Sequence, residues 1–475
     1  MYGMTPRKMA AACGGALHVP AGCENMAETE ITMITTDSRK AAEGCAFAAI
    51  RGERVDGHDF IPQVIEKGAL CVIAEKEPAM ADSIVWIGVY DTVTALGSLA
   101  AWYRQLLGLP VVGITGSVGK TSTKEMVAGV LSQKYRTLKT QGNFNNELGL
   151  PLTVFGLDRS YEMAVLEMGI SDFGEMHRLA RIARPDTCIM TNIGTCHLEQ
   201  LKDRDGVLRA KSEIFDFLEE DGHIILNGND DKLVTVREVN HVKPYYYGIP
   251  EEDRPAGGND FWPPLDFYAG QIRRLGFEGS DCVIHTPDSS FEVRVPVPGD
   301  HMIMNALAAA AAGYVYGLDE EQVRDGIASM EHVKGRFNVI RTDRLTVVDD
   351  CYNANPMSMK ASLSLLKEAD GSAAAILGDM GELGEDEVLY HEQVGAFAAE
   401  TGIRKLVCIG KLSEKMAAAA SAVEGSKTLV SWYPDIPSFL EKAMEELEEG
   451  ETVLVKASHF MHFEQIVEAL TETKS

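Results

Sequence analysis

The sequence predicts an α/β protein of three domains: a small N-terminal α/β domain, a central parallel-sheet domain, and a C-terminal Rossmann-like α/β domain. Its 475 residues suit two to four domains at roughly 100 to 200 residues each. Short apolar runs of strand length alternate with helix-like stretches along the whole chain, which is the pattern of sheets covered by helices. Breaks in this pattern place the domains at residues 1–88, 89–332 and 333–475.

The first domain and the entry into the second are defined by their apolar runs. Runs at 45–50, 69–75 and 83–89 alternate with loops rich in Gly, Asp and Arg, which predicts a small α/β unit. A helix-like stretch at 92–108 follows. It leads into an apolar strand at 110–116 that ends in a glycine turn and a polar helix start, the typical opening of a parallel α/β domain.

The later elements continue this alternation. In the central domain we expect strands at 163–169, 187–194 and 223–230, a hairpin of 282–286 and 291–297, and a helix at 302–317. In the C-terminal domain we expect strands at 345–350, 373–379, 405–410 and 452–458, with amphipathic helices between them.

Composition excludes several classes of protein. With 45% hydrophobic and 24% charged residues, the chain is globular rather than disordered. Lys+Arg 44 against Asp+Glu 71 gives 44 − 71 = −27, which argues against broad contact with nucleic acid or an anionic membrane. An anionic ligand would therefore need a local pocket lined by cations or N–H groups.

Cysteine usage and apolar runs indicate the compartment. The nine cysteines are scattered and form no CxxC pair, which fits a reducing cytoplasm better than a disulfide framework. The first residues do not resemble a secretory signal. The longest helix-like apolar run, 306–318, is too short to span a bilayer. We expect a cytoplasmic protein with no stable membrane insertion.

The most specific motif is GITGSVGKTS at residues 113–122, between an apolar strand and a helix-compatible segment. Such a loop directs backbone N–H groups and a helix N-terminus at phosphates. Lys120 can neutralise phosphate oxygens, and the Thr121 hydroxyl can bind Mg²⁺. The motif predicts a nucleotide-phosphate site, whereas a glycine turn without a ligand is the alternative.

The spacing of this loop departs from the common one. The G-x-x-x-x-G-K pattern would place a glycine at position 114, but the chain has Gly113 followed by Ile114. This difference argues against an ordinary GTPase or ATPase and indicates a subclass.

Other candidate residues follow predicted strands. Glu167 ends an apolar strand, so its carboxylate would emerge where α/β ligand sites form and could reach Mg²⁺; capping the next helix is the alternative. His197 also follows a strand, but a lone His is often an ordinary loop residue. Lys211 has the sequence context of a solvated helix lysine. The amides of Asn143, Asn145 and Asn146 suit a carboxylate or a phosphate, or simply an Asn-rich turn.

The loop and several later segments together resemble the Mur ligases of peptidoglycan synthesis, whose relatives include the folylpolyglutamate synthetases. The resemblance rests on these segments: TDSRK, GCAFAAIRGERVDGHDFI, TLKTQGNFNNELGLPLTV, VLEMGISDFGEM, VVDDCYNANPMSMKASL and ILGDMGELGEDEVLYHEQVG. They touch all three predicted domains and cover nearly the whole chain. The last two resemble the branch of the family that adds D-alanyl-D-alanine.

The resemblance implies an activity. A member of this branch is an ATP-dependent amide ligase that adds D-alanyl-D-alanine to UDP-N-acetylmuramoyl-tripeptide through an acyl phosphate, giving the pentapeptide precursor of the bacterial cell wall. Its cofactors would be ATP and two Mg²⁺ ions, and Lys211 matches a lysine that is carbamylated in the family. The two substrates would be its partners, with no nucleic acid, and the protein would be a cytoplasmic bacterial monomer.

The resemblance also assigns site residues. As catalytic residues it gives Lys120, Lys211, His197 and Arg336. As metal ligands it gives Thr121, Glu167, His197 and carbamylated Lys211. For ATP it gives Gly116, Ser117, Val118, Gly119, Lys120, Thr121, Ser122, Asn305, Arg336 and Asp349, and the choice between Asp349 and Asp350 stays open. Helix polarity, surface charge and a strand-end carboxylate are the alternatives for Asn305, Arg336 and Asp349.

Substrate contacts are assigned in the same way. They are Ser38, Arg39, Asp56, Gly57 and His58 in the N-terminal UDP-sugar-binding domain, Asn143, Asn145 and Asn146 in the centre, and Asp379, Glu382, His391 and Lys456 in the C-terminal domain. Many relatives read KGSR where this chain has Lys456, Ala457, Ser458 and His459, so a role for that turn does not carry over directly.

Two other functions remain open at this point. One is a family member that adds a single amino acid, or a folate-glutamate ligase. The other is a nucleotide-binding switch or a silent UDP-sugar-binding protein. A silent protein would be expected to have lost part of the set Lys120, Thr121, Glu167, His197 and Lys211, and all five are present.

Overall fold

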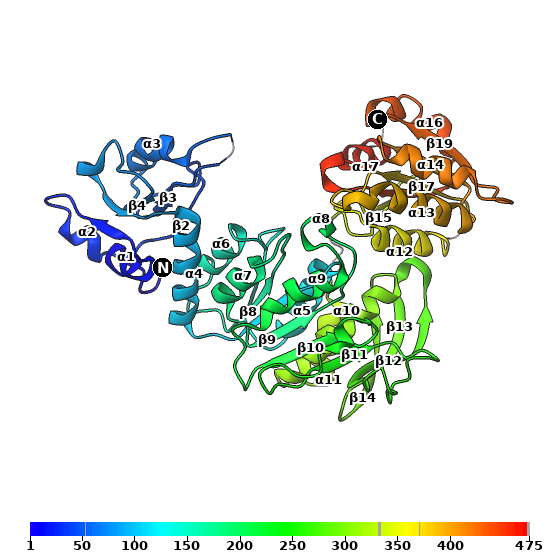
Figure 1. Cartoon of the computed structure of the whole chain (residues 1–475), viewed down its shortest axis with the longest axis horizontal. Helices are drawn as coiled ribbons and strands as arrows, with labels where there is room; N and C mark the ends of the chain where they lie inside the picture. Colours follow the sequence, from blue (N-terminus) through cyan, green and yellow to red (C-terminus); the bar gives the residue numbers. More distant parts are fainter. Residues whose placement is uncertain (53, 331–333, 370, 473–475) are drawn as a thin grey trace.

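The computed structural model describes residues 1–475 except 53, 331–333, 370 and 473–475. Three sheets of five, nine and six strands follow one another along the chain. This confirms the predicted three-part α/β fold (Figure 1). The predicted boundary between residues 332 and 333 lies outside the described residues.

The N-terminal sheet has the strand order β1-β5-β4-β3-β2. Its strands are β1 (Ala16–His18), β2 (Ile34–Thr35), β3 (Ala46–Ala48), β4 (Cys71–Ala74) and β5 (Val85–Gly88). β1 is antiparallel to β5 and the other pairs are parallel. The helices are α1 (Pro6–Cys13), α2 (Glu24–Glu28) and α3 (Ile61–Glu66). The three strands expected from the sequence are β3, β4 and β5.

The central sheet has the order β14-β13-β12-β11-β10-β9-β6-β8-β7. The strands are β6 (Val111–Thr115), β7 (Thr137–Lys139), β8 (Met163–Glu167), β9 (Thr187–Met190), β10 (His223–Asn227), β11 (Tyr245–Gly248), β12 (Phe267–Arg274), β13 (Ser280–His285) and β14 (Ser290–Val295). In this order, all neighbouring strands from β12 to β7, including β6, pair in parallel. The pairs β12–β13 and β13–β14 are antiparallel. The predicted hairpin is β13–β14, whereas β7, β11 and β12 were not predicted.

Helices cover both faces of the parallel part. These are α4 (Thr92–Leu107), α5 (Lys120–Leu131), α6 (Gly149–Phe155), α7 (Glu175–Ala183), α8 (Leu198–Leu201), α9 (Arg204–Ser212), α10 (Asp300–Val315) and α11 (Glu320–Ala328). Successive strand residues point to opposite faces. Val111 packs with α4, α6, α7 and α9, while Val112 packs with α5, α10 and α11. Burial on both faces explains why these strands are continuous apolar runs.

The C-terminal sheet has the order β15-β16-β20-β17-β18-β19. Its strands are β15 (Asn338–Arg341), β16 (Thr346–Asp349), β17 (Ala373–Gly378), β18 (Lys405–Ile409), β19 (Leu429–Tyr433) and β20 (Thr452–Lys456). The helices are α12 (Pro356–Leu366), α13 (Glu387–Glu400), α14 (Ser413–Ser421), α15 (Ile436–Leu440), α16 (Ala443–Glu446) and α17 (Glu464–Thr471). All pairs are parallel except β15–β16, and the unpredicted strands β15 and β19 form the two edges.

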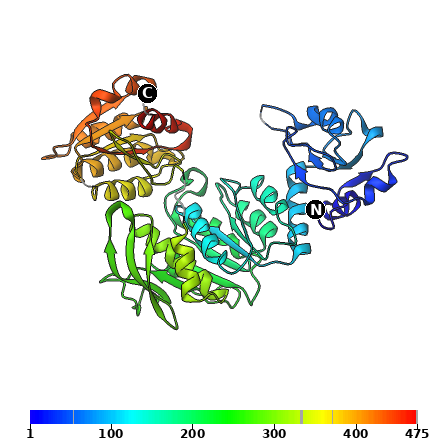
Figure 2. The same ribbon diagram turned by 180° about the vertical axis from the view of Figure 1, so that it is seen from behind.

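The N-terminal and C-terminal domains lie at opposite ends of the central domain. Both views show this arrangement, with the two outer domains on the same side of the central one (Figures 1 and 2). Helix α4 joins the first two domains, because its buried Leu96 and Leu99 belong to an apolar cluster that contains residues of both. Residues at the carboxyl ends of the central parallel strands line one cavity together with residues of the C-terminal domain.

Replacing Gly395 tests the packing of the C-terminal domain. This glycine lies on α13, and a Cβ there would be 2.0 Å from the backbone oxygen of Met416 on α14. Alanine gains about 1 kcal/mol of helix propensity. The helices must nevertheless separate, so we expect Gly395→Ala to lower the free energy of unfolding by about 1–3 kcal/mol in urea denaturation.

Gly257→Ala is the matched control, because a Cβ at Gly257 meets no atom within 4 Å. We expect it to change the free energy of unfolding by less than about 0.5 kcal/mol. Equal stability of the Gly395→Ala variant and the unsubstituted protein would contradict the described contact between α13 and α14.

Candidate active site

The phosphate loop follows β6, which ends at Thr115. Gly116 has a φ of +147° and Gly119 a φ of +85°. A Cβ at Gly116 would lie only 1.9 Å from Thr191 Oγ1, so no larger residue fits there. Gly113 lies inside β6 and contacts Pro185 and Met168. The unusual spacing has a simple explanation: Gly116 and Gly119 make the turn, and Gly113 serves strand packing.

Asn192, just beyond the end of β9, holds the loop in place. Its Oδ1 accepts the Val118 N–H at 2.9 Å, its Nδ2 donates to the Val118 oxygen at 2.9 Å, and its backbone oxygen accepts the Ser117 N–H. Thr191 Oγ1 donates to the same Val118 oxygen. The loop shape is therefore set by contacts from a neighbouring strand.

The loop opens directly into α5. Because a helix leaves the N–H groups of its first turn without internal acceptors, those of Lys120, Thr121 and Ser122 are available to a ligand. The Lys120 ammonium donates to the Gly116 oxygen at 2.9 Å. Backbone N–H groups and one lysine thus form a site suited to phosphate oxygens.

A cavity of about 420 Å³ lies over this loop, between the central and C-terminal domains. Of the residues predicted to bind a ligand, it is lined by Ser117, Val118, Gly119, Lys120, Thr121, Ser122, Asn143, Asn145, Glu167, Asn305, Arg336 and Lys456. The remaining predicted residues lie outside this set.

Glu167 ends β8 and is 2% exposed. Its Oε1 accepts Asn145 Nδ2 at 2.7 Å, and its N–H donates to Thr140 Oγ1 at 3.0 Å. Its other oxygen, Oε2, is buried and has no hydrogen-bond partner among the described residues. A buried carboxylate oxygen is costly without a partner, and Glu167 is one of the residues that line the cavity, where a cation could be that partner.

Arg336 reaches the loop from the other domain. Its Nη2 donates to Thr121 Oγ1 at 3.2 Å, although the two residues are 215 positions apart. The guanidinium also lies over the Tyr352 ring, 4.3 Å from its centroid, and this ring stacks on His459. The C-terminal domain thus places a fixed positive charge beside the phosphate loop.

Asp349 is the last residue of β16 and Asp350 follows it, and the two aspartates have different surroundings. Asp349 is 1% exposed and accepts the Gly335 N–H and the Cys351 thiol, so it supports the fold of the loop. Asp350 lines the cavity and accepts Lys456 Nζ at 2.6 Å. Of these two aspartates, between which the resemblance left the choice open, Asp350 and not Asp349 is among the residues that line the cavity.

Asn305, on α10, lies in the cavity wall. Its Oδ1 accepts Thr123 Oγ1 at 2.8 Å, which ties α10 to α5. The residue is buried, and its bond to Thr123 satisfies the amide oxygen between the two helices. The remaining Nδ2 contacts the sulfur of Met302 at 3.4 Å.

Lys211 on α9 is buried rather than solvated, with 1% of its surface exposed. Burial lowers the pKa of its ammonium to about 8, and the nearby charge of Lys120 acts in the same direction. A larger fraction of Lys211 is therefore neutral at physiological pH than for an exposed lysine. The sequence context alone had favoured the opposite environment.

His197 pairs with Glu382 across the domain boundary, with Nδ1 2.8 Å from Oε2. This hydrogen bond lowers the pKa of the Glu382 carboxyl. Both residues have positive φ, 52° and 61°. The described residues contain no group of three or more His, Cys, Asp or Glu side chains that could hold a metal ion.

Two of the residues predicted in the N-terminal domain, Asp56 and His58, are joined in one hydrogen-bond network. Asp56 accepts His58 Nδ1 at 2.6 Å and the His58 N–H, and Nε2 of this buried histidine accepts the Glu75 N–H. Arg39 pairs with Asp37, and this bond lowers the pKa of Asp37 to about 2. The bonds of Asp56 and His58 stabilise the fold of this domain. Ser38 and Arg39 belong to the separate segment that contains Asp37.

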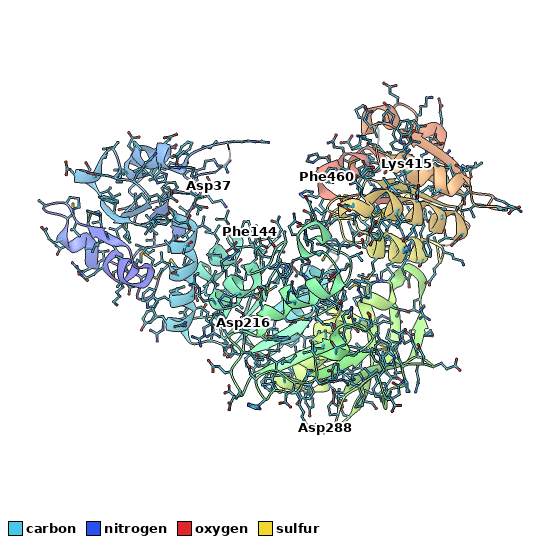
Figure 3. The ribbon with its side chains drawn as sticks, viewed as in Figure 1. Asp37, Phe144, Asp216, Asp288, Lys415 and Phe460 are labelled. Atoms are coloured by element: carbon cyan, nitrogen blue, oxygen red, sulfur yellow. The ribbon has the colours of Figure 1, made fainter. Side chains whose placement is uncertain are left out.

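Three residues labelled in Figure 3, one from each domain, face the space between the outer domains. Figure 3 shows Asp37, Phe144 and Phe460 on the sides of the three domains that border this space. Phe144 and Phe460 are 44% and 60% exposed. Large apolar side chains in such a position could contact a substrate that spans the domains.

Three more predicted substrate residues have structural partners. Asn146 Oδ1 accepts the N–H groups of Leu148 and Gly149 at the start of α6. Asp379 Oδ1 accepts the N–H and hydroxyl of Ser413 at the start of α14. His391 is fully buried and accepts the Met380 N–H at 2.9 Å. Each of these three side chains thus has an internal hydrogen-bond partner, and their contact with substrate stays a prediction.

Sequence reasoning missed Asn192, Asn227 and Tyr247, all of which line the cavity. They follow or belong to β9, β10 and β11. The signal for the first two was present, since polar residues at the carboxyl ends of parallel strands mark α/β ligand sites. Tyr247 lies within an unpredicted strand and offered no such signal.

Family models match most of the chain in three parts. The Mur ligase family catalytic domain matches residues 30–104, the Mur ligase middle domain matches 114–313, and the Mur ligase glutamate ligase domain matches 335–459. Two similar proteins are UDP-N-acetylmuramoyl-tripeptide--D-alanyl-D-alanine ligases. The one from Bacillus subtilis is 38% identical, covering 94% of both chains. The one from Escherichia coli is 36% identical, covering 94% of this chain and 95% of the relative.

Solved structures agree with this result. MurF from Acinetobacter baumannii has a TM-score of 0.87 at 33% identity and covers 99% of both chains. MurF ligase from Thermotoga maritima in complex with ADP has a TM-score of 0.79 at 28% identity, covering 92% of this chain and 97% of the other. On these matches, with the nucleotide-type loop already described, the chain belongs to the Mur ligase family.

Proposed function

We propose that this chain is an ATP-dependent ligase that joins D-alanyl-D-alanine to UDP-N-acetylmuramoyl-tripeptide, yielding the pentapeptide precursor of peptidoglycan. The observation that carries the proposal is the cavity in which the phosphate loop, Glu167 and Arg336 converge. Relatives bearing this ligase name align over 94% of the chain, which supports the choice of substrates.

The reaction requires activation, because a carboxylate and an amine do not condense in water unaided. The terminal carboxylate of the tripeptide attacks the γ-phosphate of ATP, releasing ADP and forming an acyl phosphate. The amine of D-alanyl-D-alanine then attacks the acyl carbon, phosphate leaves, and the amine loses a proton. The protein contributes position and charge: the N–H groups of the loop, Lys120 and Arg336 stabilise the phosphoryl oxygens.

The residues present fit Mg²⁺. Glu167 Oε2 is a buried oxygen without a hydrogen-bond partner among the described residues, and the Thr121 hydroxyl lies in the same cavity. Oxygen ligands of this kind suit a hard cation. Glu167 and Thr121 would hold one ion, and His197 with carbamylated Lys211 would hold a second. Bound Mg²⁺ would neutralise charge on the phosphates.

Carbamylation of Lys211 has physical support in its burial. CO₂ adds to a neutral amine, and burial lowers the pKa of this ammonium to about 8. The product is a carboxylate, which converts a buried cation into a metal ligand. Near Lys120, the new negative charge also has a favourable partner.

We infer a division of work among residues 1–88, 89–332 and 333–475. The first domain would bind the UDP-sugar through Ser38 and Arg39, the second ATP, and the third the incoming amine. Asn143 and Asn145, which line the cavity, would contact the tripeptide end. The chain would act as a cytoplasmic monomer. No helix among the described residues is long and apolar enough to cross a membrane.

A silent nucleotide-binding protein is the alternative from another class. A protein that had lost catalysis would be expected to have lost part of the set Lys120, Thr121, Glu167, His197 and Lys211, and all five are present.

Phosphate release tests the function. Purified protein with ATP, Mg²⁺, UDP-N-acetylmuramoyl-tripeptide and D-alanyl-D-alanine should release phosphate and form the pentapeptide, identified by its mass. Release should require both substrates. Turnover with a single amino acid as the amine, or with folate as the carboxylate, would overturn the proposed substrates. Binding of ATP with no turnover would favour the silent protein.

Arg336 should be needed for the phosphoryl transfer. Removing a fixed charge that stabilises a transition state costs about 10²–10³ in kcat, which we expect for Arg336→Ala. Arg336→Lys should recover part of this, because it keeps the charge but loses the planar fork. Steady-state kinetics measure both. Arg341→Ala, on the exposed end of β15, is the control and should keep full kcat; an unchanged kcat for Arg336→Ala would remove Arg336 from the mechanism.

Lys211 should make activity depend on CO₂ and pH. With a pKa of about 8, about a tenth of the amine is neutral at pH 7. After CO₂ is removed, the rate of recovery at fixed dissolved CO₂ should rise with pH and level off above about 8. Lys202→Ala, an exposed lysine nearby, should keep this response, while Lys211→Ala should abolish recovery. Full activity without CO₂ would rule out the modification.

A further inference from the structure

Lys124 is a buried cation outside the proposed mechanism. It lies on α5, one turn beyond Lys120, and is 1% exposed. Its ammonium donates to the Thr140 oxygen at 2.7 Å and pairs with Glu125 Oε1 at 2.8 Å. Glu125 also pairs through its other oxygen with Lys139. Lys124 is thus the cation that connects the phosphate-loop helix to the segment after β7.

Burial of this ion pair needs a reason other than stability. Taking a lysine out of water is costly, and replacing such a pair by apolar residues of similar size is often neutral or stabilising. An apolar side chain at position 124 would fill the space. It could not hold the Thr140 backbone at a defined distance from α5.

Thr140 passes this constraint to Glu167. Thr140 is fully buried, and its Oγ1 accepts the Glu167 N–H at 3.0 Å. Its own N–H donates to the Val165 oxygen. The loop that follows returns to the same carboxylate, since Asn145 Nδ2 donates to Glu167 Oε1 at 2.7 Å. The Lys124 ammonium is therefore linked through Thr140 to the end of the strand that carries Glu167, and Glu167 is linked in turn to Asn145.

We propose that Lys124 is a positioning residue that, through Thr140, sets the place of the Glu167 carboxylate relative to Thr121 on the phosphate-loop helix. Thr121 and Lys124 share α5, so a displacement of Thr140 changes the distance between the two oxygen groups assigned to Mg²⁺. The inference rests on the proposed function for the role of Glu167. The connection from Lys124 to Glu167 stands on the described contacts.

The test compares three variants of the full-length protein. Lys124→Met keeps the length of the side chain and removes the donor. Lys139→Met is the matched control, because it removes the other cation on Glu125 without touching Thr140. Thr140→Val keeps the carbonyl that Lys124 binds and removes the hydroxyl that accepts the Glu167 N–H, so it tests the connection even if Lys124→Met does not fold. Thermal denaturation verifies the folding of each.

Two readouts distinguish positioning from general stability. The first is the free Mg²⁺ concentration needed for half-maximal binding of a fluorescent ADP, with Glu167→Gln as the reference. Loss of a residue that orients a metal ligand typically costs 10- to 100-fold in metal affinity, so we expect a shift of about tenfold or more for Lys124→Met and Thr140→Val. The second is hydrogen exchange at the Glu167 amide, which should become faster in both.

Combined substitution should cost little more than either alone, because both variants interrupt one connection. The proposal is overturned if Lys124→Met behaves like Lys139→Met in both readouts, or if the two effects add fully. If Glu167→Gln leaves the Mg²⁺ dependence unchanged, the metal role in the proposed function fails. Even in that case, faster exchange at the Glu167 amide in Lys124→Met than in Lys139→Met would support the positioning role. Equal exchange in these two variants would overturn it.

Discussion

The close approach of Gly116 to Thr191 is the constraint on which the nucleotide site depends. A single added carbon at Gly116 would lie 1.9 Å from the Thr191 hydroxyl, and that hydroxyl donates to the Val118 oxygen. Asn192 holds Val118 from the same strand end. Because Thr191 and Asn192, which follow β9, hold the loop from outside, the start of α5 is held in place and Lys120 and Thr121 have defined places in the cavity.

The cavity is completed only by a second domain. Arg336 reaches Thr121, and Asp350 with Lys456 forms part of the opposite wall. The contact between Arg336 and Thr121 crosses from the C-terminal to the central domain, so the shape of the cavity depends on how these two domains are placed. The N-terminal domain is tied to the central one through α4 and faces the same space from the other end (Figure 1).

A protein with a net charge of −27 gathers its positive groups where the phosphates are expected. Lys120 and Arg336 line the cavity, and Lys211 is close enough to Lys120 for the two charges to interact. Lys124 and Lys456 are buried in ion pairs with Glu125 and Asp350. Glu167 and Asp350 line the same cavity, so the local arrangement of charges rather than the net charge determines which ligand can bind.

The sequence by itself determined the α/β class and, in all three sheets, the strands that are continuous apolar runs, because burial on both faces leaves a local apolar pattern. It also determined the phosphate loop with Glu167, because a strand followed by a glycine turn and a helix is a local pattern too. Edge and polar strands such as β7, β15 and β19 lack that pattern and were missed. Only the tertiary structure shows that Asp350 rather than Asp349 lines the cavity and that Lys211 and Lys124 are buried. It also shows that Asp56, Asp379 and His391 have internal hydrogen-bond partners. The physical reason is that a polar side chain acquires its role from the atoms that desolvate it and bond to it, and these come from segments far away in the chain.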